Sequence, residues 1–247
     1  MIPISYNGAK GRFAAKIARL FPILDSSTPY IEPFVGTGAV TLEVLSRTKR
    51  RCMVHLNDAN GELMNLWTAI TWHHERFQSR LEGAIAGMVN PQPVDFIDRA
   101  VNFYLDHQKL ARYKTSNVSL MVRNFEKVAR LLENFQCLFT SMDAIELVKA
   151  CGVYKPSGRW NGAVIYCDPP YIDTEGYDHD VDHGALAAAL RAAAAQGHHV
   201  FVSLNVCEKA DELYSGWRKV PIKKLAGRAD RGERYEVVYT PSLRLEV

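Results

Sequence analysis

One short segment carries the clearest chemistry in the chain, Asp168-Pro169-Pro170-Tyr171, which directly follows an apolar run. The two prolines lack N–H groups and restrict the backbone, so the chain must leave the strand in one stiff, extended shape. The Asp168 carboxylate and the Pro169 carbonyl can then each accept a hydrogen from an exocyclic amino group, while Tyr171 stacks on the ring that carries it. We predict a site for a planar, amino-bearing base.

A turn that contains glycines near the amino-terminal end gives a second candidate site. Residues 30–42 indicate a strand, a turn and the beginning of a helix, and Gly36 and Gly38 allow a tight bend that a ligand can approach closely. Thr41 replaces the third glycine of the dinucleotide fingerprint, which argues against a nicotinamide or flavin pyrophosphate. The pattern therefore favours a ligand that lacks a pyrophosphate.

The second strand-like run ends in Asn57-Asp58. A carboxylate at this position can hold the two ribose hydroxyls of a nucleoside in an α/β fold. Taken alone, Asp58 would be interpreted as a helix cap, since both residues are good caps and a helical pattern follows. Because the glycine turn precedes it at the expected place, we interpret Asp58 as a ribose-binding residue.

The elements that must position these residues alternate between strand and helix. Helical patterns lie between most of the strand-like runs, which are residues 30–31, 53–56, 137–140, 163–167, 199–204 and 236–239. This alternation predicts an α/β fold with a mainly parallel sheet. Residues 61–135 break the rhythm with apolar stripes at helical spacing. We predict a helical insertion at 61–135 in a catalytic domain formed by residues 1–60 and 136–247.

Basic residues gather in three places along the chain. They are Arg123, Lys127 and Arg130 at helical spacing, Lys109, Arg112 and Lys114 before them, and Arg228 and Arg231 near the last strand-like run. Such residues either keep a surface soluble or contact phosphates in a manner that depends on salt but not on base sequence. Both interpretations stay open here, and the net charge of +3 is compatible with a nucleic-acid partner.

The composition argues against several other classes of protein. The five cysteines are scattered and form no CxxC pair, which is typical of a reduced, cytoplasmic protein without a disulfide framework or zinc site. No apolar run approaches about 18 residues, so we expect no membrane span. His179 and His183 could ligate a metal, but a loop that ends in an aspartate helix cap is the preferred interpretation. We therefore predict no metal.

Two motifs together carry a family resemblance. Phe34-x-Gly36-x-Gly38, followed far downstream by the segment at 168–171, resembles the Dam-type (D12 class) adenine-N6 DNA methyltransferases, which use S-adenosylmethionine. The resemblance implies a Rossmann-like, seven-stranded methyltransferase sheet, mostly parallel, with one antiparallel strand from the last hairpin. It also implies that the insertion recognises the target. The Asn/Gly-rich hairpin that relatives push into the major groove is not found there, which allows relaxed or short-site recognition.

The same resemblance implies roles for further residues. Tyr6 and Lys10 are similar to the family's amino-terminal block, whose aromatic residue and lysine line the methionine end of the cofactor and the active site. Asp143 resembles an acid that borders the cofactor's adenine, although Ala144 stands where an aromatic residue often follows. The predicted S-adenosylmethionine site therefore comprises Tyr6, Lys10, Phe34, Gly36, Gly38, Asp58 and Asp143.

Together these features predict an enzyme that transfers the methyl group of S-adenosylmethionine to N6 of a flipped-out adenine in DNA, with Asp168, Pro169 and Tyr171 as catalytic residues. The alternatives are methylation of RNA adenine N6 or of cytosine N4, and a non-catalytic module that binds nucleic acid. We expect double-stranded DNA as the partner and a monomer in the cytoplasm of a prokaryotic or phage-infected cell. The resemblance leaves room for a cognate restriction endonuclease.

Overall fold

The computed structural model describes residues 10–11, 13–87, 95–108, 118–172, 181–225 and 234–241. Six residues singled out in the sequence lie outside this part of the chain: Tyr6, Lys109, Arg112, Lys114, Arg228 and Arg231. His179 lies outside it as well.

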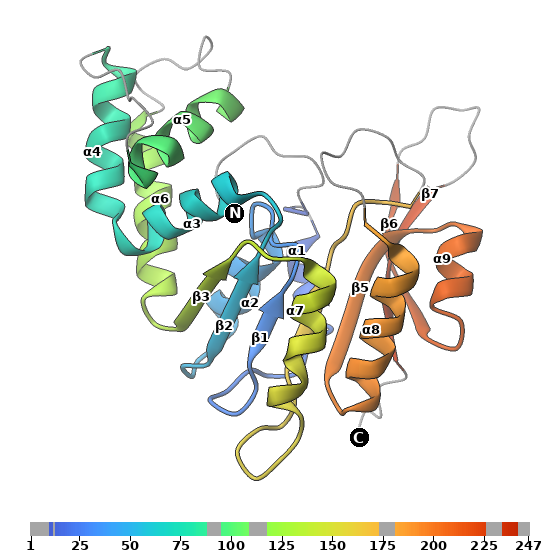
Figure 1. Ribbon diagram of the computed structural model, residues 1–247. Helices are drawn as coiled ribbons and strands as arrows, with labels where there is room; N and C mark the ends of the chain where they lie inside the picture. Colours follow the sequence, from blue (N-terminus) through green and yellow to red (C-terminus); the bar gives the residue numbers. More distant parts are fainter. Residues whose placement is uncertain are drawn as a thin grey trace.

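Across the described residues the fold is built on a seven-stranded sheet with the order β3-β2-β1-β4-β5-β7-β6 (Figure 1). The strands are β1 (Tyr30–Glu32), β2 (Met53–Asn57), β3 (Gln136–Thr140), β4 (Val164–Cys167), β5 (His199–Asn205), β6 (Arg218–Leu225) and β7 (Arg234–Thr240). Neighbouring strands are parallel except at β7, which runs antiparallel to both β5 and β6. The predicted mostly parallel sheet with one antiparallel strand is confirmed.

One strand, β6, was not among the runs predicted from the sequence pattern. It forms an edge of the sheet, and its pairing with β7 shifts register between Pro221 and Lys223. Proline and lysine are common on edge strands, where they discourage further pairing, and they interrupt the apolar alternation by which strands are found. An edge strand of this composition is therefore hard to detect in one sequence.

The two faces of the sheet carry separate cores, because successive residues of a strand point to opposite sides. Tyr30 and Tyr166 lie in one core, and Ile31 and Ile165 lie in the other. The first core is covered by α1 (Ala14–Ala18) and α2 (Ala39–Arg47), and the second by α7 (Ala144–Ala150), η3 (Cys151–Tyr154), α8 (His183–Ala195) and α9 (Glu208–Leu213). Figure 1 shows α7 and α8 in front of the sheet. Every residue of β4 is buried as a result.

Four helices lie between β2 and β3: α3 (Gly61–Trp72), α4 (His74–Ile85), α5 (Phe96–Gln108) and α6 (Val118–Leu132). Their packing centres on Phe77, Tyr104 and Phe125, whose rings meet edge to face with centroids 5.1 to 6.4 Å apart. These rings belong to the same continuous core as Tyr30 of β1. The four helices therefore extend the core of one sheet face toward the β3 side (Figure 1).

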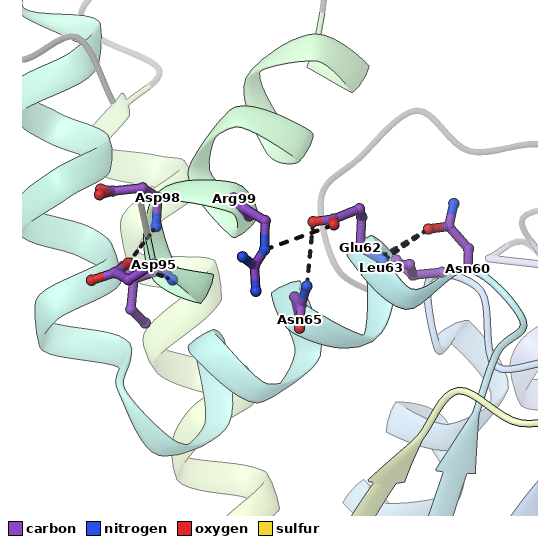
Figure 2. Close-up of polar contacts among 8 residues, drawn as sticks. Asn60, Glu62, Leu63, Asn65, Asp95, Asp98 and Arg99 are labelled. Atoms are coloured by element: carbon purple, nitrogen blue, oxygen red, sulfur yellow. Dashed lines mark hydrogen bonds and ion pairs between the residues drawn. The ribbon is translucent and has the colours of Figure 1, made fainter. Parts of the chain in front are cut away.

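Side-chain caps fix where two of these helices begin (Figure 2). The side-chain oxygen of Asn60 accepts hydrogen bonds from the backbone N–H groups of Glu62 and Leu63, at 3.1 and 3.2 Å. Asp95 likewise accepts from two N–H groups in the first turn of α5, at 2.9 and 3.0 Å. Glu62 also faces Arg99, with 3.9 Å between charged atoms. The caps satisfy backbone donors that a helix start leaves unpaired, and the ion pair links α3 to α5.

No helix within the described ranges has the length and apolar character that a bilayer span requires.

Candidate active site

Several polar residues meet along the edge of the sheet that is formed by the carboxyl ends of its parallel strands. Asp168 follows β4 directly, and Asn205 is the last residue of β5. Glu236 pairs with Asn205 from the antiparallel strand β7, so it reaches the same edge. The glycine turn follows β1, which is the parallel neighbour of β4. The topology thus brings the two predicted sites together at the carboxyl ends of β1 and β4, where ligands bind in open α/β sheets.

Lys10 lies at the centre of this edge. Its Nζ atom is 2.8 Å from Asp168 Oδ1 and 3.3 Å from Glu236 Oε1. The lysine and both carboxylates are largely buried, with side-chain exposures of 6%, 14% and 3% in the order Lys10, Asp168, Glu236. Two acidic groups therefore share one ammonium group. The sequence analysis included Lys10 and Asp168 but missed Glu236, whose neighbours in β7 are apolar.

Burial controls the titration of this group. It raises the pKa of the Asp168 carboxyl to about 6, although the charge of Lys10 opposes the shift. Burial alone would lower the pKa of Lys10, but attraction to Asp168 and Glu236 outweighs it and the pKa is raised. Near neutral pH the site therefore holds a charged lysine beside an ionised Asp168.

Tyr171 completes the turn beside Asp168. Lys10 Nζ donates a hydrogen bond to Tyr171 Oη at 3.4 Å and lies 5.0 Å from the centre of the ring. Burial raises the pKa of the Tyr171 phenol to about 12, so the ring carries a neutral hydroxyl near neutral pH. Pro169 is buried, whereas Tyr171 is half-buried. An acceptor and a flat ring thus lie next to each other, as the motif predicts, with an ammonium group between them.

The glycine turn contacts the predicted ribose-binding acid directly. Gly36 has a φ of +49° and donates its backbone N–H to Asp58 Oδ2 at 3.0 Å. The other carboxylate oxygen, Oδ1, accepts the backbone N–H of Asn60 at 3.0 Å. The cap of α3 is supplied by Asn60, so the interpretation of Asp58 as a helix cap is wrong. Asp58 instead joins the end of β2 to the glycine turn.

The structure explains why residue 38 is a glycine. Its φ is +64°, and a Cβ at this position would lie 2.3 Å from the indole of Trp67. Trp67 also donates its Nε1–H to the carbonyl oxygen of Gly36 at 3.0 Å. The side from which a Cβ would project is thus filled by protein, and Trp67 accounts for the glycine at 38. The predicted contact of Gly38 with the cofactor stays a prediction.

Asn57 ties together the ends of three strands. Its amide nitrogen donates to the carbonyl oxygens of Pro33 and Met142, both at 3.0 Å. Its amide oxygen accepts from the Thr140 hydroxyl at 2.8 Å and from the Met142 N–H at 2.9 Å. All four hydrogen bonds that an asparagine amide can make are formed. This buried side chain fixes the loops after β1, β2 and β3 relative to one another.

Asp143 and Phe34 lie near the same edge. Asp143 is exposed and caps α7, accepting the N–H groups of Ile145 and Glu146 at 2.9 Å through Oδ1. Phe34 is half-buried and packs against the core under α7 and α8. Their predicted contacts with the cofactor stay predictions.

Glu32 is a further buried acid that the sequence analysis did not select. Its Oε2 accepts a hydrogen bond from the Tyr30 hydroxyl at 2.6 Å and another from the Thr41 hydroxyl. Burial raises the pKa of Glu32 to about 8, so this carboxyl is mostly protonated at neutral pH. Thr41, which replaces the third glycine of the dinucleotide fingerprint, therefore fastens the helix after the turn to β1.

Comparison with known proteins decides the family. Residues 6–156 match the family described as "D12 class N6 adenine-specific DNA methyltransferase". The chain belongs to this family. The match includes the glycine turn and Asp58 and ends before Asp168. The family resemblance predicted from the sequence motifs is confirmed, and the implied use of S-adenosylmethionine follows in general terms from membership.

Individual relatives extend the comparison. A curated protein of Escherichia phage P1, "DNA N-6-adenine-methyltransferase", is 27% identical over an alignment 250 residues long, gaps included, that covers 88% of this chain. The chain spans 32% of the length of that relative. Among solved structures, the rRNA methyltransferase aviRa from Streptomyces viridochromogenes is similar with a TM-score of 0.48 and 15% identity, covering 96% of this chain and 86% of that one. The putative methyltransferase yhhF from Escherichia coli gives 0.41 and 10%, covering 97% and 91%.

Of the basic groups predicted from the sequence, the one on α6 lies within the described residues. Arg123, Lys127 and Arg130 are exposed, while Phe125 and Val128 on the same helix are buried. The predicted amphipathic pattern of this helix is confirmed. Contact of the three basic residues with DNA stays a prediction.

Among the described residues, no three histidine, cysteine, aspartate or glutamate side chains are grouped so that they could hold a metal ion. The described His183 begins α8, and Asp182 before it caps the helix by accepting the Ala185 N–H at 2.9 Å. The predicted aspartate cap is confirmed.

Proposed function

We propose that this D12 methyltransferase transfers the methyl group of S-adenosylmethionine to N6 of adenine in DNA. The observation that carries the proposal is the buried Asp168 carboxylate beside Tyr171, at the same sheet edge as the turn in which Gly36 contacts Asp58. Family membership supplies the substrate class, and this arrangement supplies groups that suit the reaction.

The residues at the edge fit a nucleoside cofactor. The Asp58 carboxylate lies where β2 ends and next to the Gly36 N–H, so it can accept hydrogen bonds from ribose hydroxyls. Asp143 uses one oxygen for its helix cap, which leaves the other to face an adenine amino group. When bound, S-adenosylmethionine supplies an activated methyl group on its sulfonium. The chain therefore has to orient two ligands and needs no nucleophile of its own.

Asp168 and Pro169 would act on the target nitrogen. The lone pair of adenine N6 is delocalised into the ring, which makes this nitrogen a poor nucleophile. Hydrogen bonds from both N–H groups to the Asp168 carboxylate and the Pro169 carbonyl favour a pyramidal nitrogen and offset the positive charge that develops during transfer. Orientation of the two reactants can account for roughly 7–11 kcal/mol of the barrier.

The target base must leave the duplex to reach a site at the sheet edge. Extrusion costs a few kcal/mol, and stacking on an aromatic ring offsets part of it. Tyr171 is half-buried beside Asp168 and would serve as this stacking surface.

Substitution of Asp168 tests the proposal. Asp168→Ala removes an acceptor needed as charge develops, so we expect turnover to fall by about a hundredfold or more. Asp182→Asn is the matched control, because asparagine caps a helix as well as aspartate does and α8 should stay intact. Purified variants are incubated with radiolabelled S-adenosylmethionine and duplex DNA or RNA, and the nucleic acid is digested to nucleosides.

The assay also separates the alternatives. Label in N6-methyl-2′-deoxyadenosine from duplex DNA supports the proposal. Label only in N4-methyl-2′-deoxycytidine, only in RNA nucleosides, or in no nucleoside contradicts it. An Asp168→Ala rate within about tenfold of the wild-type rate would contradict the role given to Asp168.

A further inference from the structure

Glu236 is a second carboxylate within reach of the ammonium group that contacts Asp168. Its Oε1 lies 3.3 Å from Lys10 Nζ, against 2.8 Å for Asp168 Oδ1. The two acids come from different strands, Glu236 from β7 and Asp168 from the end of β4, with β5 between those strands. Lys10 therefore stands between two acceptors that the fold holds in fixed positions.

The fold itself gives no clear reason for an acid at position 236. The neighbouring residues Val237 and Val238 are apolar and buried, and Glu236 is buried with them. Removing a carboxylate from water is unfavourable, and a well-packed apolar residue is often as stable as a buried ion pair or more so. A buried acid that faces a candidate active site is better explained by a role in that site.

The position of Lys10 creates a conflict for the proposed reaction. The ammonium group contacts Asp168 Oδ1 and donates to Tyr171, the two groups assigned to the amino group and ring of the target base. While the ammonium group keeps this place, Asp168 Oδ1 and the Tyr171 hydroxyl are occupied, and the charge of the carboxylate is partly neutralised. A shift of Lys10 away from Asp168 would make the carboxylate a stronger acceptor for an N6 hydrogen, and the buried ammonium group would then need another acceptor.

We propose that Glu236 is a positioning residue that takes over the ammonium group of Lys10 as the target base enters, which leaves the Asp168 carboxylate to accept one N6 hydrogen while the Pro169 carbonyl accepts the other. The inference rests on the proposed function. Lys10 keeps its proton and exchanges one ion pair for another. No bond is made or broken in this step.

A charge-neutral variant tests the exchange. In Glu236→Gln the shape is kept, but the negative charge that would receive the Lys10 ammonium group is lost, so we expect turnover on DNA to fall by about tenfold or more, an effect of the size seen when a group that orients a ligand is lost. The KM for S-adenosylmethionine should change less than the turnover does. Glu236→Asp retains the charge on a shorter side chain and should keep more activity than the glutamine variant. Glu212→Gln, an exposed change on α9, is the matched control.

A double-mutant cycle with Lys10→Met separates positioning from a structural role. If Glu236 acts through Lys10, then Glu236→Gln should change the activity of the Lys10→Met protein by less than about twofold. Losses that multiply would mean that Glu236 acts independently, and they would overturn the inference. Equal activity of the glutamine and aspartate variants would overturn it too.

The same experiment keeps the two proposals apart. A wild-type protein that methylates DNA, together with multiplicative losses in the cycle, leaves the proposed function standing and removes only the role of Glu236. A wild-type protein that transfers no methyl group to DNA removes both. Unfolding temperatures of all variants are measured alongside. If the glutamine variant is inactive because it is unfolded, the aspartate variant decides: retained activity supports the role of Glu236, and lost activity in a folded protein contradicts it.

Discussion

Two features together require a glycine at position 38. The positive φ of +64° is unfavourable for any residue with a Cβ, and the indole of Trp67 fills the space into which a Cβ would project. Trp67 is fully buried and donates a hydrogen bond to the carbonyl oxygen of Gly36, so its ring cannot shift easily to make space for a Cβ. The glycine at this position is thus set by a residue of α3, outside the motif that made it conspicuous.

Gly38→Ala should therefore destabilise the protein more than backbone strain alone does. Left-handed backbone in alanine costs roughly 1–2 kcal/mol, and overpacking a core adds typically about 1–3 kcal/mol. We expect a loss of about 3 kcal/mol in the free energy of unfolding, measured in urea. Gly216→Ala is the control, since its φ is +78° and no atom lies within 4 Å of its Cβ position. Equal losses in the two variants would contradict the role of Trp67.

Glu32 should make stability depend on pH between about 4.5 and about 8. Burial raises its pKa to about 8 in the folded protein, whereas the unfolded chain titrates near the ordinary value of 4.5. Between these values the folded state holds a proton that the unfolded state has released, so stability falls as pH rises and levels off above about 8. In this range the Tyr30 and Thr41 hydroxyls hydrogen-bond a carboxyl that is losing its proton in a buried position.

The test compares wild type with Glu32→Gln by urea unfolding at about pH 6.5 and 8.5. Wild type should lose about 2 kcal/mol more than the variant between these conditions, because the glutamine does not titrate. The lower pH lies above the pKa of about 6 of Asp168, so that carboxyl contributes little to the difference. Parallel curves for the two proteins would show that Glu32 does not control the dependence.

Among the elements, those with strong local patterns were the ones that the sequence could predict. β4 ends at prolines that cannot continue a strand, and α8 begins at Asp182, a good helix cap. α6 shows its apolar and basic sides in helical spacing. In each case the signal lies within the element, so neighbours in the sequence are enough to reveal it.

The elements and contacts that escaped prediction depend on partners far along the chain. β6 looks polar because it is an edge strand, and its pairing with β7 is what makes it a strand. In the sequence, Glu236 has the pattern of a single exposed acid in a short strand, and only the structure shows its contact with Lys10. Trp67 looks like one more apolar residue in a helical stripe until it meets Gly36 and Gly38. A single sequence gives no measure of such distances.

Helix α3 links two parts of the molecule, because it belongs to the helical segment between β2 and β3 and also contacts the glycine turn. Trp67 bonds to Gly36, and its ring also stacks on Phe139 of β3 with 6.3 Å between centroids. The Asn60 cap starts this helix two residues after Asp58. The helices predicted to recognise the target are therefore in direct contact, through Trp67, with the turn predicted to hold the cofactor.

At the scale of the whole molecule, the helices α3 to α6 extend from the sheet on the β3 side (Figure 1). Asp168 follows the carboxyl end of β4, which is separated from β3 by β2 and β1. A duplex whose target base enters near Asp168 could also run along these helices. The exposed basic residues of α6 would then meet its phosphates and add affinity without reading the sequence. The net charge of +3 is too small to supply such affinity unless it is concentrated locally.

Removing the charges of α6 should therefore weaken DNA binding and its dependence on salt together. In the triple variant Arg123→Gln, Lys127→Gln, Arg130→Gln, the slope of log Kd against log salt concentration should fall by about 0.9 for each residue that contacts a phosphate. The control neutralises Lys149, Lys155 and Arg159, which are exposed and lie in α7 and in the segment between α7 and β4. Binding is followed by fluorescence anisotropy of a labelled duplex over a salt series. If both variants keep the wild-type slope, the duplex does not follow α6, and its phosphates must meet another surface of the molecule.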